Sequence, residues 1–138
     1  MFIKPLRHFV NGFIPADTWT YLFDDLFRLD TKVYEPYGEG VQVAGVLVQQ
    51  GTDYFLYRDF DAARSGARDH TIKVRVVSNP PEQVGTQLPS IMVGKVVVIV
   101  GYFHNDGKDA GTIDAYSIRW SSLKTLDPKL LYRELVIL

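Results

Sequence analysis

A run of five consecutive β-branched residues, Val96 to Val100, constrains the fold of this chain more than any other feature. β-Branched side chains are restricted in a helix and pack well on a pleated sheet. The run is flanked by Gly94 and Gly101, and the whole stretch 94–103 therefore predicts a buried strand around which the other elements are organised. We expect the two glycines to be the points at which this strand bends.

The composition excludes several classes of protein. A chain of 138 residues fits one domain, and an apolar content of 46% argues against disorder. The absence of cysteine excludes disulfides, Cys-ligated zinc and thiol catalysis. The formal net charge of -1 provides no overall attraction for nucleic acid, so a site for a polyanion must be a local patch.

The N-terminal residues 1–10 are apolar but are interrupted by Lys4, Pro5, Arg7 and His8. They therefore lack the unbroken apolar core of a secretory signal. No run approaches the roughly 20 apolar residues of a membrane helix. These features predict a soluble, cytoplasmic protein without a membrane segment.

Residues 1–40 form an N-terminal extension that we expect to contain a helix. Asn11-Gly12 favours a tight turn, either in a short hairpin or in an arm that lies on the core. Asp17 is a suitable N-cap, and apolar residues then recur at spacings of three and four until the helix ends near Asp30. These apolar residues are Trp19, Leu22, Phe23, Leu26 and Leu29.

Asp24 and Asp25 fall on the opposite side of this predicted helix. Neighbouring carboxylates can bind metals or act in acid–base catalysis, but adjacent helical positions point in different directions. Because no second acidic or histidine cluster accompanies them, we interpret the pair as part of a solvated face.

The segment 41–121 predicts five strands. Strands at 41–48 and 53–59 flank a glycine turn and predict a hairpin. The polar, small-residue segment 60–70 predicts a mobile loop. The further predicted strands are 71–77, 95–103 and 112–120.

The predicted strand 71–77 has the clearest period-two alternation in the chain. Ile72, Val74 and Val76 should face the core, while Lys73 and Arg75 should face solvent. This strand therefore predicts a basic exposed face.

Residues 122–138 predict a short C-terminal helix followed by an apolar tail. The helix should start at Asp127-Pro128, because an N-cap followed by proline is typical of a helix start. The tail is too apolar to be free, and we expect it to pack on the core or on a partner. It consists of Leu135, Val136, Ile137 and Leu138.

The strand layout resembles the small five-stranded Greek-key barrel of OB-fold domains of the nucleic-acid-binding type. Val43-Ala-Gly-Val-Leu-Val48 resembles the first OB strand, in which glycine allows a bend that lets one strand serve both sheets. Residues 54–59 and 72–76 are similar to the second and third strands, and 94–101 with 113–118 to the closing pair. The fold class implied is mainly β, an OB-like barrel with short N- and C-terminal helical additions.

The resemblance implies non-enzymatic binding of single-stranded nucleic acid, expected to be DNA, by aromatic stacking and cation–phosphate contacts on the second and third strands. Lys73 and Arg75 are the leading candidates; the alternative is that they only protect an exposed sheet face from aggregation. Tyr54 and Tyr57 lie on opposite faces, and the pattern leaves open which is inside. The other candidates are Arg58, Arg64, Arg68, Tyr102, His104 and Lys108.

A protein-interaction or structural role is the alternative function. The near-neutral charge and the apolar termini are compatible with self-association or a protein partner through residues 135–138. We expect no cofactor and no metal site, because His8, His70 and His104 have no ligand spacing. No nucleophile elbow or phosphate loop is present in the sequence, so we also expect no enzymatic activity.

Overall fold

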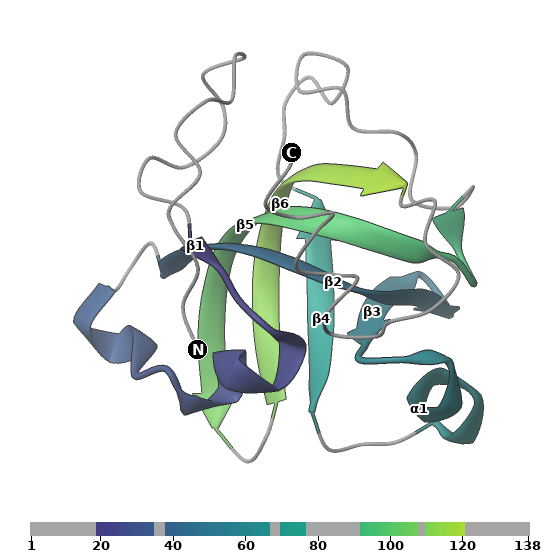
Figure 1. Ribbon diagram of the computed structural model, residues 1–138, viewed down its shortest axis with the longest axis horizontal. Coiled ribbons are helices and arrows are strands. Elements are labelled where there is room, and N and C mark those ends of the chain that lie inside the picture. Colours follow the sequence, from purple (N-terminus) through teal and green to yellow (C-terminus); the bar gives the residue numbers. More distant parts are fainter. Residues whose placement is uncertain (1–18, 35–37, 67–69, 77–91, 108–109, 121–138) are drawn as a thin grey trace.

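A computed structural model describes residues 19–34, 38–66, 70–76, 92–107 and 110–120 (Figure 1). Short helical elements precede and interrupt a set of strands. In chain order the elements are β1 (Trp19–Thr20), the 3-10 helices η1 (Phe23–Arg28) and η2 (Thr31–Tyr34), β2 (Glu39–Gln50), β3 (Asp53–Tyr57), α1 (Phe60–Ser65), β4 (Thr71–Val76), β5 (Val96–Gly107) and β6 (Ala110–Trp120).

Strands β2 to β6 close into a barrel. Neighbouring strands follow the order β2-β3-β4-β6-β5, and β5 pairs again with β2. The β4–β6 pairing is parallel, whereas the other pairings around the barrel are antiparallel. This arrangement confirms the predicted five-stranded Greek-key, OB-like barrel, in which the third strand lies beside the fifth.

Strand β2 serves both sides of the barrel, as the resemblance implies. Its residues 39–46 pair with β5, and its residues 46–50 pair with β3, so the change of partner falls at Val46. A Cβ atom on the preceding Gly45 would lie 2.6 Å from the carbonyl oxygen of Tyr57 and 2.6 Å from Cγ of Leu56. Glycine is therefore required at Gly45, where β2 passes from one partner to the other.

The run Val96–Val100 is buried, with no residue more than 3% exposed. This confirms the buried strand on which the fold prediction depends. Gly101 lies at a bulge between β5 and β6, where the register shifts after Val100. Gly94 is different, because it has a φ of +81° in the turn before β5 and donates from its amide to the carbonyl of Leu47. It is a turn residue, and the prediction that it bends the strand is wrong.

The hydrophobic core of the described residues consists mainly of aliphatic side chains, together with Tyr21, Phe23 and Phe103. Ile72 and Val74 of β4 point into it, as predicted, but Val76 is 37% exposed at the end of its strand. Val76 pairs with the buried Ala115 and so projects from the predicted face, but the prediction that it is buried is wrong. The principal core residues are Leu26, Val41, Val43, Leu47, Leu56, Ile72, Met92, Ile99, Phe103, Ile113 and Ile118.

The continuous helix predicted up to Asp30 is wrong. Trp19–Thr20 instead forms β1, parallel to β2, and the amide of Tyr21 donates to the carbonyl of Gln42 at 3.0 Å. The helical part is the single 3-10 helix η1, whose N-cap residue Leu22 provides no side-chain cap. Pairing with the otherwise open edge of β2 satisfies backbone groups of both segments, and this outweighs the helical periodicity.

The segment 60–70, predicted to be a mobile loop, contains the helix α1. Asp59 caps it by accepting a hydrogen bond from the amide of Ala62 at 2.7 Å, and Gly66 ends it in the left-handed conformation. Both signals are present in the sequence. The cap and the terminating glycine leave six helical residues between them, which is fewer than two turns.

Asn105 of β5 joins the end of η1 and the residues after it to the barrel by hydrogen bonds. Its side-chain amide donates to the carbonyls of Phe27 at 3.1 Å and Leu29 at 2.9 Å. Its backbone amide donates to the hydroxyl of Thr31 at 2.8 Å, and its side-chain oxygen accepts from the amide of Gly107 at 2.9 Å. One residue thus joins the N-terminal extension to the β5–β6 turn.

Asn105→Ala is expected to lower the free energy of unfolding by roughly 1–3 kcal/mol, because two backbone carbonyls lose their donor. Asn105→Asp is the matched variant, since it keeps an acceptor for Gly107 but removes the amide donor. Urea denaturation of both variants measures the effect. A stability within about 0.5 kcal/mol of the wild type for both would show that this attachment contributes little.

The helices in the described ranges are too short and too polar to cross a membrane. The predicted turn at Asn11-Gly12, the cap Asp17, the helix from Asp127 and the apolar tail 135–138 lie outside these ranges.

Candidate functional site

An open pocket lies against the outer face of β3, β4 and β6, between the end of α1 and the β5–β6 turn. Its volume is ≈ 510 Å³, within the range of about 300–1,000 Å³ that is usual for ligand sites. Both polar and aromatic side chains line it. The lining residues are Gln50, Phe55, Tyr57, Gly66, Thr71, Lys73, Asp106, Ala110, Gly111 and Thr112.

The strand register explains why these side chains meet. Phe55 of β3 pairs with Lys73 of β4, and Lys73 pairs with Thr112 of β6. Directly paired residues project from the same face of a sheet, so the three side chains form one row across three strands. An aromatic ring, an ammonium group and a hydroxyl therefore stand beside one another at the pocket.

Phe55 and Tyr57 are the aromatic residues of the pocket. Tyr57 is only 3% exposed, and its hydroxyl accepts a hydrogen bond from Nε2 of Gln50 at 3.2 Å. Phe55 is half-buried and presents its ring on the same side. Tyr54, by contrast, packs against the hydrophobic core. Of the two predicted tyrosines, Tyr54 therefore belongs to the inner face, and Tyr57 lines the pocket.

Lys73 is exposed at the pocket, as its alternation predicts. Its side chain is 46% accessible, and the carboxylate that it pairs with is that of Asp53 at 4.0 Å. An exposed ion pair of this kind contributes about 0–1 kcal/mol. The ammonium group can therefore exchange Asp53 for an incoming anion at small cost.

Arg75 is exposed as predicted, but it forms an ion pair with Asp114, the residue of β6 that pairs with it on the same outer face. Its Nε and one terminal nitrogen lie 2.7 Å and 2.6 Å from Oδ1 of Asp114. The other carboxylate oxygen of Asp114 lies 3.4 Å from Nε2 of His104. Tyr102 packs edge-on against Tyr116 on this face, with ring centroids 5.7 Å apart. Lys73 and Arg75 thus have different surroundings.

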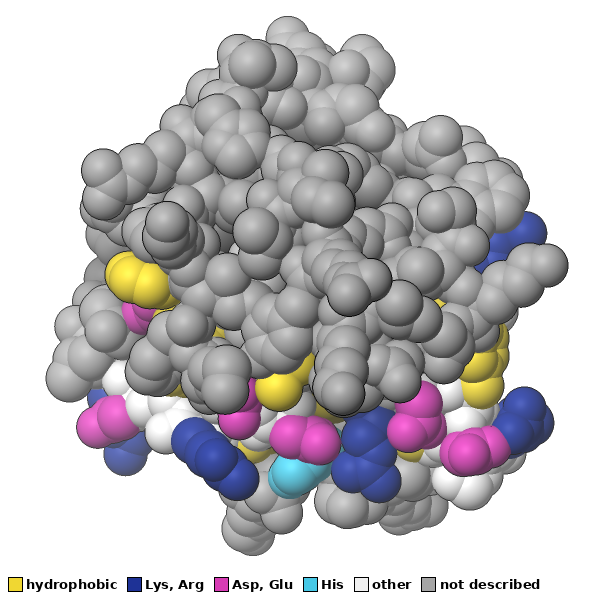
Figure 2. Space-filling view, in the orientation of Figure 1, with side chains coloured by type: hydrophobic (Ala, Val, Ile, Leu, Met, Phe, Trp, Pro, Cys, Tyr) yellow, Lys and Arg dark blue, Asp and Glu magenta, His cyan; other side chains and the backbone are white. Residues whose placement is uncertain are grey.

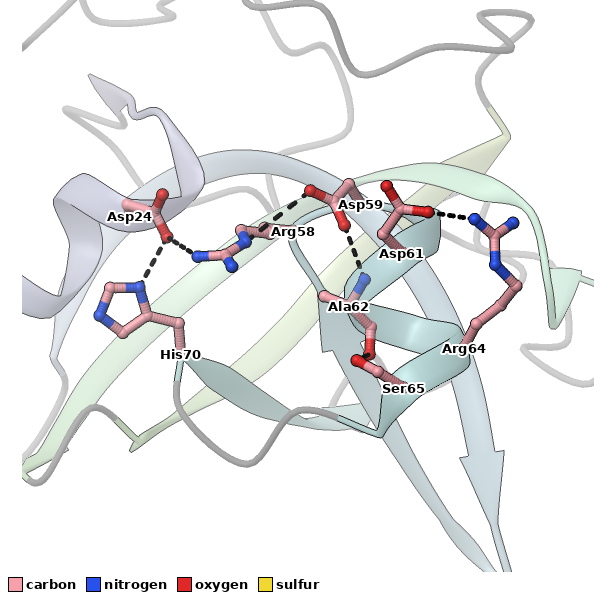
Figure 3. A network of polar contacts seen from close by, with 8 residues as sticks. All are labelled: Asp24, Arg58, Asp59, Asp61, Ala62, Arg64, Ser65 and His70. Carbon is pink, nitrogen blue, oxygen red and sulfur yellow. Dashed lines mark hydrogen bonds and ion pairs between the residues drawn. The ribbon is translucent and has the colours of Figure 1, made fainter.

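Arg58 and Arg64 lie in a separate network of charges near α1 (Figure 3). Arg58 stands between Asp24 at 3.8 Å and Asp59 at 3.7 Å, and Arg64 pairs with Asp61. These two arginines do not line the pocket.

Asp24, predicted to be part of a solvated face, is half-exposed and is the centre of a contact between η1 and the start of β4. Its Oδ1 lies 2.7 Å from Nδ1 of His70, and the His70 ring stacks on Phe27 with centroids 4.5 Å apart. The pair joins the N-terminal extension to the barrel, as Asn105 does on another side. A structural role accounts for these contacts.

The predicted cations do not converge into one basic groove. In the described part of the chain, Lys73, Arg75, Arg58 and Arg64 each pair with a carboxylate. Figure 2 shows the same balance, with Lys and Arg side chains interleaved with Asp and Glu along one rim of the molecule. Arg68 and Lys108 lie outside the described residues. Lys73 is the predicted cation that lines the pocket.

Sequence reasoning missed Phe55, Asp106 and Thr112 as pocket residues. The four residues from Tyr54 to Tyr57 are all apolar or aromatic, so the pattern does not show which side of β3 faces outward. The pairing of Phe55 with Lys73 decides it. Because Lys73 faces solvent, the register of β3 against β4 would have identified Phe55 as an outer-face residue, but the sequence does not contain that register.

Within the ranges that the structure describes, no three His, Asp or Glu side chains are grouped so that they could hold a metal ion. Comparison of the sequence with protein-family models and with curated proteins finds no match.

Proposed function

We propose that the protein binds single-stranded nucleic acid, expected to be DNA, at the pocket on the outer face of β3 and β4. The observation that carries this proposal is the row of Phe55, Lys73 and Thr112. Stacking of a base on an aromatic face and neutralisation of a phosphate by lysine are the two interactions that such binding requires. In OB-type barrels the corresponding strands and the β5–β6 turn are the usual place for an oligonucleotide.

The balance of charge makes this a site with few phosphate contacts. Arg75 is held closely by Asp114, so Lys73 is the principal cation available at the pocket. Binding should therefore depend weakly on salt, since each phosphate contact to a single strand contributes about -0.7 to the slope of log K against log[salt].

Fluorescence anisotropy with a labelled thymidine oligonucleotide, repeated over a range of salt concentrations, tests the function. Wild-type protein is expected to bind with a slope of about -1 to -2, and Lys73→Ala should make it less negative by about 0.7. Arg28→Ala is the matched control, because Arg28 is an exposed cation on η1 that does not line this pocket. Undetectable binding by the wild type at low ionic strength would overturn the proposal.

A protein-interaction role is the second candidate function. The pairing of each described candidate cation with a carboxylate favours it, because a charge-balanced face suits a protein surface better than a polyanion. The oligonucleotide titration distinguishes the two functions: salt-dependent binding that requires Lys73 supports the first, and its absence leaves the second.

A further inference from the structure

Asp106 introduces a negative charge into a pocket that otherwise suits a nucleic acid. It belongs to the end of β5 and lines the pocket together with Lys73 and Phe55. Its Oδ2 accepts a hydrogen bond from the hydroxyl of Thr112 at 2.7 Å. An ionised carboxylate has about four acceptor sites, so this contact leaves most of its accepting capacity available.

The residues around Asp106 hold it in place. The preceding Asn105 is fastened to Phe27, Leu29 and Thr31, as described above. The following Gly107 has a φ of +79° and donates its amide to Asn105. The carboxylate of Asp106 also accepts from the hydroxyl of Thr112, so Asp106 is held by its two chain neighbours and by Thr112 in the absence of a ligand. Such preorganisation favours selective recognition.

A carboxylate repels phosphate and accepts hydrogen bonds from the donors on a base. The bases differ in the donors that they offer on the Watson–Crick edge. Guanine has two adjacent donors, N1–H and the 2-amino group, which match the two oxygens of a carboxylate. Cytosine and adenine offer one amino group on this edge, and thymine offers a single N–H between two carbonyl oxygens. Phosphate contacts position a strand, whereas contacts to base edges specify its sequence.

We propose that Asp106 makes this pocket selective for guanine. The inference rests on the proposed function, because it requires a strand placed with one base on Phe55 and a phosphate near Lys73. The carboxylate then accepts from N1–H and the 2-amino group of that base, while Thr112 orients it. The pocket volume of ≈ 510 Å³ leaves room for a purine.

Inosine provides the test, since it differs from guanosine only by lacking the 2-amino group. Three labelled oligothymidylates are compared by anisotropy: one unchanged, one with a central deoxyguanosine and one with a central deoxyinosine. Wild-type protein is expected to bind the guanine oligomer about tenfold more tightly than the inosine oligomer, because a charged acceptor loses one donor. Asp106→Asn should remove this preference.

Asp61→Asn is the matched control, because Asp61 is an exposed carboxylate on α1 that does not line the pocket. It should retain the preference for guanine. Equal binding of all three oligomers by the wild type would overturn the selectivity while the proposed function stands. A preference that persists in Asp106→Asn would overturn the role of Asp106, and no binding of any oligomer would overturn the proposed function itself.

Discussion

Gly101→Ala is expected to be the most destabilising single substitution in the barrel. A Cβ atom at this position would lie 2.1 Å from the carbonyl oxygen of Asp114 and 2.8 Å from its carbonyl carbon. Backbone atoms cannot move aside without breaking the β5–β6 pairing, so we expect a loss of about 3 kcal/mol or more in the free energy of unfolding. A total stability of roughly 5–15 kcal/mol is usual, and the loss would remove a large part of it.

Thermal and urea denaturation measure this effect, with Gly51→Ala as the control. Gly51 has a φ of +63°, but a Cβ atom there would meet nothing within 4 Å. Its replacement should cost only about 1–2 kcal/mol, the strain of a left-handed alanine. An equal loss of stability in the two variants would show that the backbone at the bulge relaxes around the added methyl group. The close approach at Gly101 would then not be the dominant effect.

Phe55→Leu is expected to produce the largest loss of nucleic-acid affinity. Leucine keeps much of the apolar area but has no aromatic face, and stacking contributes about 1–3 kcal/mol per base, which corresponds to roughly 5- to 150-fold in affinity. Phe55→Tyr retains a ring and should bind within about threefold of the wild type if the pocket admits the hydroxyl. Anisotropy with the thymidine oligonucleotide measures both.

Phe55 is half-buried on the outer face and does not belong to the core cluster. The leucine variant should therefore keep most of its stability, which a denaturation curve checks. An unchanged affinity in the folded Phe55→Leu variant would exclude base stacking on this ring. Together with Lys73→Ala, the variant separates the stacking contribution from the electrostatic one.

Stability and binding depend on different parts of the same barrel. Val96–Val100 and Gly101 support the closed architecture, whereas Phe55, Lys73 and Asp106 lie at its outer face. Strand β6 lies between the two parts, because its residue Thr112 pairs with Lys73 of β4 on one side and with His104 of β5 on the other. Variants of the pocket can therefore be tested for binding without loss of the fold.

The N-terminal extension shows why local periodicity is a limited guide. Leu26 of η1 is fully buried, so the apolar spacing there does identify residues that face the core. It does not determine the type of element, because Trp19–Thr20 pairs with β2 where a strand edge would otherwise be open. A backbone group that needs a hydrogen-bond partner depends on its three-dimensional neighbours, which no short window of sequence contains.

The barrel was expected from the resemblance of the strand order to OB domains. The amino-acid sequence by itself determined the five strands of that barrel and the outward direction of Lys73 and Arg75. These follow from the alternation and the β-branched residues, which act over a few positions of the chain. Only the tertiary structure decided that Phe55 stands beside Lys73, that Asp114 holds Arg75 and that Asp106 enters the pocket. Such contacts join residues distant in sequence through strand register, and side-chain chemistry alone does not specify which of many possible pairs will form.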